Sequence, residues 1–328
     1  MTRNRPSSHP YETLTPDTII AAVEALGHVC DGRILALNSY ENRVYQVGRE
    51  EGGPVVVKFY RPGRWTTPAI QEEHEFALEL ARAEIPVVAP EVHGGRTLHE
   101  YDGFRYAVYR RAGGRWPELG TSDDRQWMGR FLARIHNVGR SRRFLHRQRL
   151  DWETLGADTV DYLLEHRWIP AHIEVAYESV ASDALDLVAQ RFDEAAPYRE
   201  FRLHGDCHPG NVLWTDDGPH FVDLDDCMTG PAIQDLWMLL SGKPEEMRAQ
   251  LDDLLQGYEE FADFDRHELT LIEPLRTLRI MHYAGWLARR WDDPAFPRAF
   301  PWFEEPKYWE QHVLNLREQI AAMEEMPT

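Results

Sequence analysis

The sequence predicts an α+β protein in which a small lobe built on an antiparallel sheet is followed by a larger, mostly helical lobe. Three observations support this fold class. Short runs rich in Val, Ile, Leu and Tyr lie between turn residues in the first third of the chain. Apolar residues at helical spacing dominate the remainder. Within that remainder, residues 202–224 contain two short apolar runs on either side of a turn, which is typical of a β-hairpin.

Composition narrows the class of protein further. The chain has 328 residues and a net charge of −19, which argues against a nucleic-acid partner and against an anionic membrane surface. No apolar run approaches the ~18 residues of a membrane span, and the polar start lacks the apolar core of a signal peptide. Three cysteines without a CxxC pair argue against a disulfide framework. We therefore expect a cytoplasmic monomer.

The smaller lobe is expected to begin with a helix that Thr15 caps, with Pro16 in its first turn and Gly27 at its end. Three consecutive strands should follow and pair antiparallel, because only short runs of turn residues separate them. A second helix starts at Thr67, and a further strand comes after it. The four strands are expected over residues 33–37, 42–47, 55–60 and 104–109.

The larger lobe is expected to follow a connector rich in Gly, Pro and Arg, so that the two lobes cover residues 1–110 and 111–328. Its helices are indicated by apolar spacing, and its hairpin by two runs around a turn. The helical segments are 128–135, 173–180, 185–188, 245–262 and 266–290. The hairpin strands are 212–214 and 220–224, with the turn at 216–218.

Polar residues of the hairpin segment form a set suited to phosphoryl transfer. Asn211 and Asp223 offer hard oxygen ligands of the kind that Mg²⁺ prefers. Asp206, free of the metal, can accept a proton from an attacking hydroxyl. The alternative interpretation is an acidic turn in which Asn and Asp serve only as turn formers.

Lys58 gives the phosphoryl-transfer interpretation more weight. Only three of the 36 basic residues are lysines, and Lys58 lies in the middle of an apolar strand. Strand side chains alternate, so Val56, Lys58 and Tyr60 share one face. From there the ammonium can hold nucleotide phosphates, oriented by a glutamate of the next helix. Glu72, Glu73 and Glu75 are the candidates, and helical spacing alone does not choose among them. The alternative is an edge lysine whose stem covers apolar surface.

The motif His-Gly-Asp-x-His-x-x-Asn, followed by a hairpin and a second Asp downstream of Val-x-Lys, resembles the aminoglycoside phosphotransferase/choline kinase branch of the protein kinase-like fold. Within that branch, the runs LNSYENRVYQV, VVKFYRP and FVDLDDCMTGPAIQDLWMLL are similar to bacterial stress-response Ser/Thr protein kinases. The similarity extends from about residue 12 to residue 310. It implies a bilobal kinase fold, with a nucleotide-binding lobe at 1–110 and a catalytic, substrate-binding lobe at 111–328.

The resemblance implies roles for individual residues of the larger lobe. Asp206 is implied as the catalytic base. Asn211 and Asp223 are implied as Mg²⁺ ligands, and Asp223 thereby also belongs to the catalytic set. His204 is expected to be a structural residue of the loop, and Asp235 to fix the catalytic loop by hydrogen bonds.

In the smaller lobe, the resemblance places Lys58 and Ser39 at the ATP phosphates. Glu73 is our choice as the partner of Lys58. The chain departs from ordinary protein kinases here, because the phosphate loop has no GxGxxG, and Ser39 and backbone N–H groups would have to replace it. The metal motif is Asp223-Leu-Asp rather than Asp-Phe-Gly.

Two further features near the motif are expected to have no direct role in phosphoryl transfer. Cys207, next to Asp206, is expected to be an inert thiol rather than a redox sensor. The acidic pair Asp225 and Asp226 is expected either to recognise a basic substrate or to face solvent.

The sequence therefore predicts an ATP- and Mg²⁺-dependent kinase that phosphorylates Ser/Thr hydroxyls of proteins in a bacterial stress response. One alternative is a small-molecule kinase with an amino alcohol or sugar as acceptor. Another is a nucleotide-binding regulator without turnover, although such a protein has no reason to keep Lys58, Asp206, Asn211 and Asp223 together. A zinc hydrolase using His204, Asp206 and His208 is the weakest candidate.

Overall fold

The computed structural model describes residues 9–216 and 218–325. The chain divides into two compact units, each made of separate segments. The sheet unit comprises Pro10–Gln148 and Glu200–Phe264. Among the described residues, the helical unit comprises His9 and the ranges 149–199 and 265–325. These units do not follow the expected division at residue 110, because the hairpin segment and several helices belong with the sheet. The assignment of separate roles to residues 1–110 and 111–328 stays a prediction.

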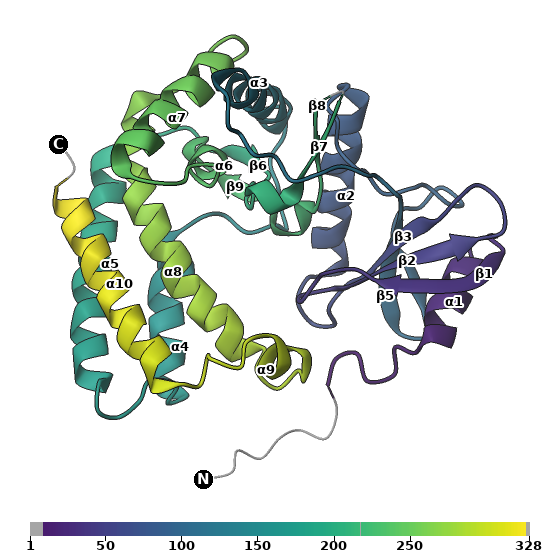
Figure 1. Cartoon of the computed structure of the whole chain (residues 1–328), viewed down its shortest axis with the longest axis horizontal. Helices are drawn as coiled ribbons and strands as arrows, with labels where there is room; N and C mark the ends of the chain where they lie inside the picture. The colour runs from purple at the N-terminus through teal and green to yellow at the C-terminus, as the bar shows by residue number, and fades with distance from the viewer. Residues whose placement is uncertain (1–8, 217, 326–328) are drawn as a thin grey trace. The chain divides into compact units, whose positions relative to one another are not determined.

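The sheet unit contains the expected antiparallel sheet, in the order β1-β2-β3-β5-β4. The short edge strand β4 was not predicted, because three residues carry no readable alternation. The strands labelled in Figure 1 are β1 Cys30–Ala36, β2 Arg43–Arg49, β3 Val55–Phe59 and β5 Phe104–Arg110. The edge strand β4 is His99–Tyr101.

Two helices accompany this sheet. Helix α1 (Pro16–Glu24) starts as predicted, since the Thr15 hydroxyl accepts the N–H of Thr18 at 3.2 Å. Helix α2 (Thr67–Arg82) is capped by Thr66, one residue before the predicted start.

The two faces of β3 explain the position of Lys58. Val55, Val57 and Phe59 are buried in a core that also contains Ile19 and Val23 of α1. The opposite face carries Tyr60, which packs with Ile70 of α2 and Ala107 of β5. Because side chains alternate along a strand, Lys58 lies on the same face as Tyr60, the face against which α2 packs.

The rest of the sheet unit holds short strands and helices. Three of these short elements, β6, β9 and α6, were not predicted. The elements are α3 Ser122–Gly139, β6 Phe201–Leu203, β7 Val212–Thr215, β8 Gly218–Phe221, β9 Met228–Gly230, α6 Ile233–Trp237 and α7 Pro244–Tyr258. The hairpin β7–β8 confirms the predicted pair of strands, with its second strand ending at Phe221 rather than residue 224. Asp217 of the predicted turn lies outside the described residues.

Helices α3 and α7 approach so closely that only glycine fits at two points. A Cβ added to Gly129 would lie 1.9 Å from the Leu254 carbonyl oxygen. One added to Gly257 would lie 2.0 Å from the carbonyl oxygen of Gln126. The two helix backbones are therefore in direct contact, which holds α3 against α7.

The helical unit is built mainly from α5 (Glu174–Ala195), α8 (Ile272–Arg289) and α10 (Pro306–Glu324), which lie side by side (Figure 1). Its core is rich in aromatic residues, including Tyr177, Phe303 and Trp309. Smaller elements complete the unit: a π-helical turn Glu153–Ala157, α4 Asp158–Glu165, a 3-10 helix Arg266–Leu271 and α9 Ala295–Ala299.

The extents of two predicted helical segments differ from the helices observed in the helical unit. The separate segments 173–180 and 185–188 form one helix, α5. The segment 266–290 is not one helix, because its first turns are 3-10 and α8 begins at Ile272. Pro274 in the first turn explains this start, since proline supplies no N–H to a helix that would continue through it. Among the described helices, none is both long and apolar enough to span a bilayer.

The helical unit should lose stability in mild acid through His312. Its ring is 3% exposed and stacks on Tyr177 with centroids 5.8 Å apart, and burial lowers its pKa to about 4. The histidine of the unfolded chain takes up a proton near pH 6.5. Below that pH the unfolded state therefore binds more protons than the folded state, so the free energy of unfolding falls as the pH drops from 6.5 toward 4. In urea unfolding, the free energy of unfolding of wild type should fall between pH 7.5 and pH 5. We expect this fall to be about 2 kcal/mol smaller in the neutral variant His312→Phe.

The matched control is His166→Phe, because His166 lies exposed at the end of α4. It should keep the wild-type acid dependence. Equal pH dependence in wild type and His312→Phe would contradict this role of His312.

Candidate functional site

The candidate site in the sheet unit is organised around the ammonium group of Lys58. Its Nζ lies 3.1 Å from Oε1 of Glu73, 3.2 Å from Oδ1 of Asp223 and 3.0 Å from Oδ1 of Asp225. The lysine itself is only 6% exposed. The consecutive elements β3 and α2 and the distant turn after β8 therefore meet at one buried cation.

The structure distinguishes among the three glutamates that the sequence left open. Glu73 pairs with Lys58 and accepts the Tyr60 hydroxyl at 3.2 Å. Glu72 instead accepts the backbone N–H groups of Leu145, His146 and Arg147, at 2.6, 2.8 and 3.0 Å. Glu73 is thus the residue placed to orient Lys58, and Glu72 holds a loop.

Burial and charge act in opposite directions on Lys58. Burial lowers the pKa of its ammonium, but Asp225, Glu73 and Asp223 together outweigh burial and hold that pKa well above its usual value. For Glu73 the balance is reversed, since burial raises its pKa more than Lys58 lowers it. Lys58 therefore stays charged at any physiological pH.

Asp225 corrects the expectation that both acidic residues of the pair face solvent or substrate. Its carboxylate is buried and forms ion pairs with Lys58 and with Arg64, while Arg147 donates to its carbonyl oxygen. Burial raises its pKa, but the nearby cations, Arg64 first, hold that pKa well below its usual range. Asp226 is partly exposed and binds Arg64 at 2.5 Å.

Sequence reasoning missed Arg64 and Arg147. Arg64 lies in the loop between β3 and α2, and Arg147 lies after α3. Both bring positive charge to a cluster that otherwise holds one lysine and several carboxylates. In a chain where nearly all basic residues are arginine, no local pattern distinguishes these two.

The loop that carries Asp206 and Asn211 forms a second part of the site. The Asn211 amide nitrogen donates to the Asp206 carbonyl oxygen at 2.9 Å and to its Oδ2 at 3.3 Å. His208 Nε2 lies 3.5 Å from the same Oδ2. Because the amide nitrogen is turned toward Asp206, the amide oxygen of Asn211 faces another direction and can ligate a cation.

Asp235 accepts hydrogen bonds from the start of this loop. Its oxygens accept the backbone N–H of His204 at 2.9 Å and of Gly205 at 2.8 Å. They also accept Nε2 of His136 at 3.1 Å, and the Nδ1 of His136 pairs with the Tyr258 hydroxyl at 2.9 Å. Asp235 is fully buried, and although burial raises its pKa, these donors and above all His136 lower it overall. No local sequence pattern distinguishes His136 from the other histidines.

Two residues of the loop are constrained by close approach to the segment after β8. Gly205 has φ +83°, and a Cβ there would lie 2.3 Å from the carbonyl oxygen of Asp226, so only glycine fits. His204 is buried, and its Nε2 bonds to the Val222 carbonyl oxygen at 3.0 Å. The Cys207 side chain is buried as well, and burial raises the pKa of its thiol, which suits the expected inert role.

Asp223 and Ser39 lie at turns. Asp223 follows β8 rather than ending the strand, and it has the left-handed φ of 58° and a side chain that is 52% exposed. One of its oxygens contacts Lys58, so the carboxylate is open to solvent and still tied to the buried cation. The Ser39 hydroxyl donates to the carbonyl oxygen of Asn42, within the turn between β1 and β2.

Comparison with known proteins gives one family and a set of full-length relatives. Residues 33–271 match the model of the phosphotransferase enzyme family. Stress response kinase A of Escherichia coli O157:H7 is 45% identical over 328 residues, covering 98% of this chain and 97% of that protein. Serine/threonine protein kinase RdoA of Salmonella typhimurium (strain LT2) is 44% identical over 324 residues, covering 97% and 96%.

Solved structures of more distant proteins share the fold. An amicoumacin kinase superposes with a TM-score of 0.68 at 21% identity, covering 88% of this chain and 93% of its own. A microcompartment-associated aminopropanol kinase gives a TM-score of 0.68 at 20% identity, covering 93% and 96%. The bilobal fold predicted from the sequence is thereby confirmed.

The buried ion cluster around Lys58 should contribute to the free energy of unfolding. Asp225→Asn removes a buried charge that faces Lys58 and Arg64, so it should lower the free energy of unfolding by about 3–5 kcal/mol in urea. Asp226→Asn is the matched control, since its carboxylate is partly exposed and should cost at most about 1 kcal/mol. Similar losses in the two variants would mean that Asp225 does not balance the cluster.

Proposed function

This chain belongs to the phosphotransferase enzyme family, and we propose that it is an ATP-dependent kinase that phosphorylates Ser and Thr hydroxyls of proteins. One observation carries the proposal. A single lysine, Lys58, is held between Glu73 and Asp223, at 3.1 and 3.2 Å. A buried ammonium tied to a helix glutamate and to the carboxylate after a hairpin is the arrangement that phosphoryl transfer from a nucleotide uses.

In this proposal, Lys58 holds the phosphates of ATP. Glu73 orients the ammonium, and Asp225 adds further negative charge on the same group. Arg64 and Arg147 offset that negative charge, so the cluster is not left with a large excess of one sign. Ser39 and the backbone N–H groups of its turn are the proposed contacts to the phosphates from the smaller lobe.

Asp206 is the proposed catalytic base. It accepts the proton of the acceptor hydroxyl as the oxygen of that hydroxyl forms its bond to the γ-phosphorus. The bond from the γ-phosphorus to the bridging oxygen breaks, and ADP leaves with that oxygen. The hydrogen bond from Asn211 to the Asp206 carboxylate and the Asp235 contacts to the preceding residues keep the base in one orientation.

Asn211 and Asp223 fit a divalent cation such as Mg²⁺. Both offer oxygen atoms, which is the donor type that Mg²⁺ prefers. The Asp223 side chain is 52% exposed, and the Asn211 amide nitrogen already has acceptors on Asp206, which leaves the amide oxygen for a cation. When bound, Mg²⁺ supplies positive charge against the phosphate oxygens.

The acceptor is proposed from the relatives. Full-length relatives at 44–45% identity are named stress response kinase A and serine/threonine protein kinase. We propose the same acceptor class and a role in a bacterial stress response for this chain. The alternative is a small-molecule acceptor, because the solved structures that share the fold include an aminopropanol kinase and an amicoumacin kinase.

Removal of the proposed base should abolish turnover while the protein stays folded. We expect Asp206→Asn to lower ATP-dependent phosphoryl transfer by about 10²–10⁴-fold, because the amide cannot take up the hydroxyl proton. Asp183→Asn, on the exposed surface of α5, is the matched control and should keep wild-type activity. Comparable ADP formation by wild type and Asp206→Asn would rule out this mechanism.

Lys58→Arg should lose activity although its charge is retained. A planar guanidinium does not fit a space in which three carboxylates approach a compact ammonium within 3.2 Å. We expect a loss of about 10²-fold or more in kcat/KM for ATP. Retained turnover would show that the ammonium is not specifically required.

The acceptor can be identified by paired labelling. Wild type and Asp206→Asn are each incubated with γ-labelled ATP and either cell extract protein or a set of amino alcohols and sugars. Phosphoserine and phosphothreonine formed by wild type alone support a protein kinase. Transfer only to the small molecules, dependent on Asp206, would favour the alternative and overturn the protein acceptor.

A further inference from the structure

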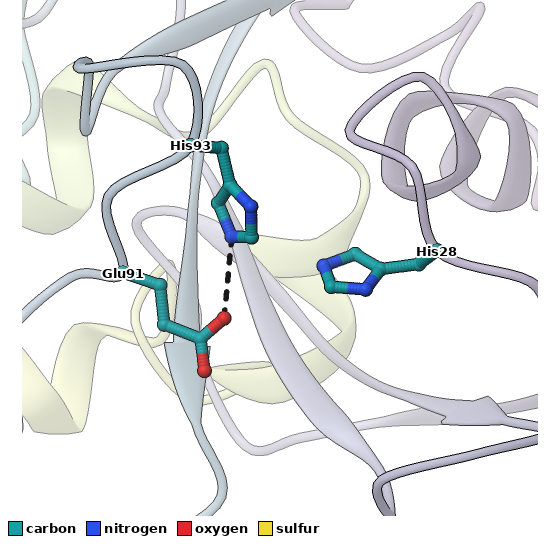
Figure 2. Close-up of side chains that lie close together, drawn as sticks. All are labelled: His28, Glu91 and His93. Atoms are coloured by element: carbon teal, nitrogen blue, oxygen red, sulfur yellow. Dashed lines mark hydrogen bonds and ion pairs between the residues drawn. The ribbon is translucent and has the colours of Figure 1, made fainter.

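A second group of ligating side chains lies in the sheet unit, apart from the residues assigned to phosphoryl transfer. His28 lies between α1 and β1, while Glu91 and His93 lie between α2 and β4. One ligand atom from each of the three lies within 4.8 Å of the other two, and all three side chains are half-buried. Figure 2 shows the imidazole of His28 directed toward the pair formed by Glu91 and His93.

The backbone fixes Glu91 and His93 before any ion arrives. The two residues are two positions apart in an extended segment, so their side chains point to the same side. The Glu91 N–H donates to the Val108 carbonyl oxygen of β5 at 2.7 Å. His93 and Arg96 exchange both backbone hydrogen bonds across Gly94 and Gly95, whose φ values are positive, as a two-residue hairpin requires.

The polar atoms of the trio are not fully satisfied by the protein. His93 Nε2 lies 3.2 Å from Glu91 Oε2. Within the described part of the chain, the Nε2 atom of His28 is shielded from solvent and has no hydrogen-bond partner. The rings of His28 and His93 stand nearly perpendicular, with centroids 5.0 Å apart. An imidazole nitrogen that is shielded from solvent, has no hydrogen-bond partner and lies near a carboxylate and a second imidazole would be satisfied by a cation shared among the three.

We propose that His28, Glu91 and His93 bind one Zn²⁺ ion. Two imidazoles and a carboxylate are a known ligand set for zinc, with water in the fourth position. Zn–ligand bonds of about 2.0–2.1 Å place tetrahedral ligand atoms about 3.4 Å apart, so the three ligand atoms, which now lie within 4.8 Å of one another, would move closer on binding. The nitrogen ligands favour Zn²⁺ over Mg²⁺, which separates this site from the proposed Mg²⁺ ligands Asn211 and Asp223.

Arg49 gives the site a defined proton arrangement. Its Nη1 lies 3.3 Å from Nδ1 of His28, and a guanidinium only donates, so Nε2 carries the hydrogen of the neutral ring. When the ion occupies Nε2, that hydrogen moves to Nδ1, and the contact with Arg49 ends. Arg49 keeps its bonds to the carbonyl oxygens of Gly52 and Gly53, at 2.8 and 2.6 Å. Burial and Arg49 lower the pKa of His28, and metal ligation takes the neutral imidazole.

The consequence for the protein is a cross-link within the sheet unit. The ion would tie the connection before β1 to the segment that is bonded to β5. Binding to the folded chain alone stabilises it by mass action. Zn²⁺ should therefore raise the unfolding temperature of the full-length protein at saturating Mg²⁺.

The test uses untagged full-length protein, stripped of metal and titrated with Zn²⁺ by calorimetry in excess Mg²⁺. We expect one equivalent to bind with micromolar affinity or tighter, and His28→Gln and His93→Gln each to weaken binding by more than about tenfold. His99→Gln is the matched control, since its ring lies 5.9 Å from that of His93 but outside the trio. Arg49→Gln should bind Zn²⁺ at least as tightly as wild type.

A second measurement does not depend on the folding of variants. Co²⁺ added to the wild-type protein should give the strong visible absorption of a four-coordinate site, and Zn²⁺ should displace it. Absence of Zn²⁺ binding to wild type, equal affinity in all four variants, or loss of binding only in His99→Gln would each overturn the proposal. Because none of these readouts involves turnover, failure of the zinc site and failure of the proposed kinase activity are distinguishable.

Discussion

The buried ammonium of Lys58 is the interaction on which the organisation of the sheet unit depends. A charge removed from water is costly unless it is paired and hydrogen-bonded. The protein meets this requirement with carboxylates from α2 and from the turn after β8, so the sheet, its helix and the segment that follows the hairpin are held at one point. The extra negative charge in turn requires Arg64 and Arg147. A network of this kind is sensitive to the loss of any member.

A second buried carboxylate, Asp235, holds the loop in place, as Asp225 holds the cation Lys58. Asp235 is surrounded by donors rather than by cations, so it orients backbone N–H groups and His136. The glycine at position 205 lets this loop approach the chain after β8 more closely than any side chain would permit. Charge balance at Asp225 and directional hydrogen bonding at Asp235 together hold the residues of the site in defined positions.

Sequence-based predictions were correct where a regular periodicity or a motif could be recognised. The period of two placed Lys58 on the correct face, and the spacing from Asp206 to Asn211 indicated two residues that do bond to each other. Sequence alone could not choose Glu73 from its neighbours, because that choice depends on how α2 is rotated against β3. Asp225 was misjudged because its turn is 3-10, where no strand alternation applies. Strands of three residues, such as β6 and β9, are too short to show a period.

The division of each compact unit among separated segments has a consequence for synthesis on the ribosome. The sheet unit is complete once Phe264 has emerged, and it can then fold while the rest of the chain is still being made. Helix α5, by contrast, is translated well before α8 and α10, the helices that cover its apolar face. The side chains that pack on Tyr177, among them Trp309 and His312 of α10, are therefore synthesised last, and this face of α5 lacks their cover until then.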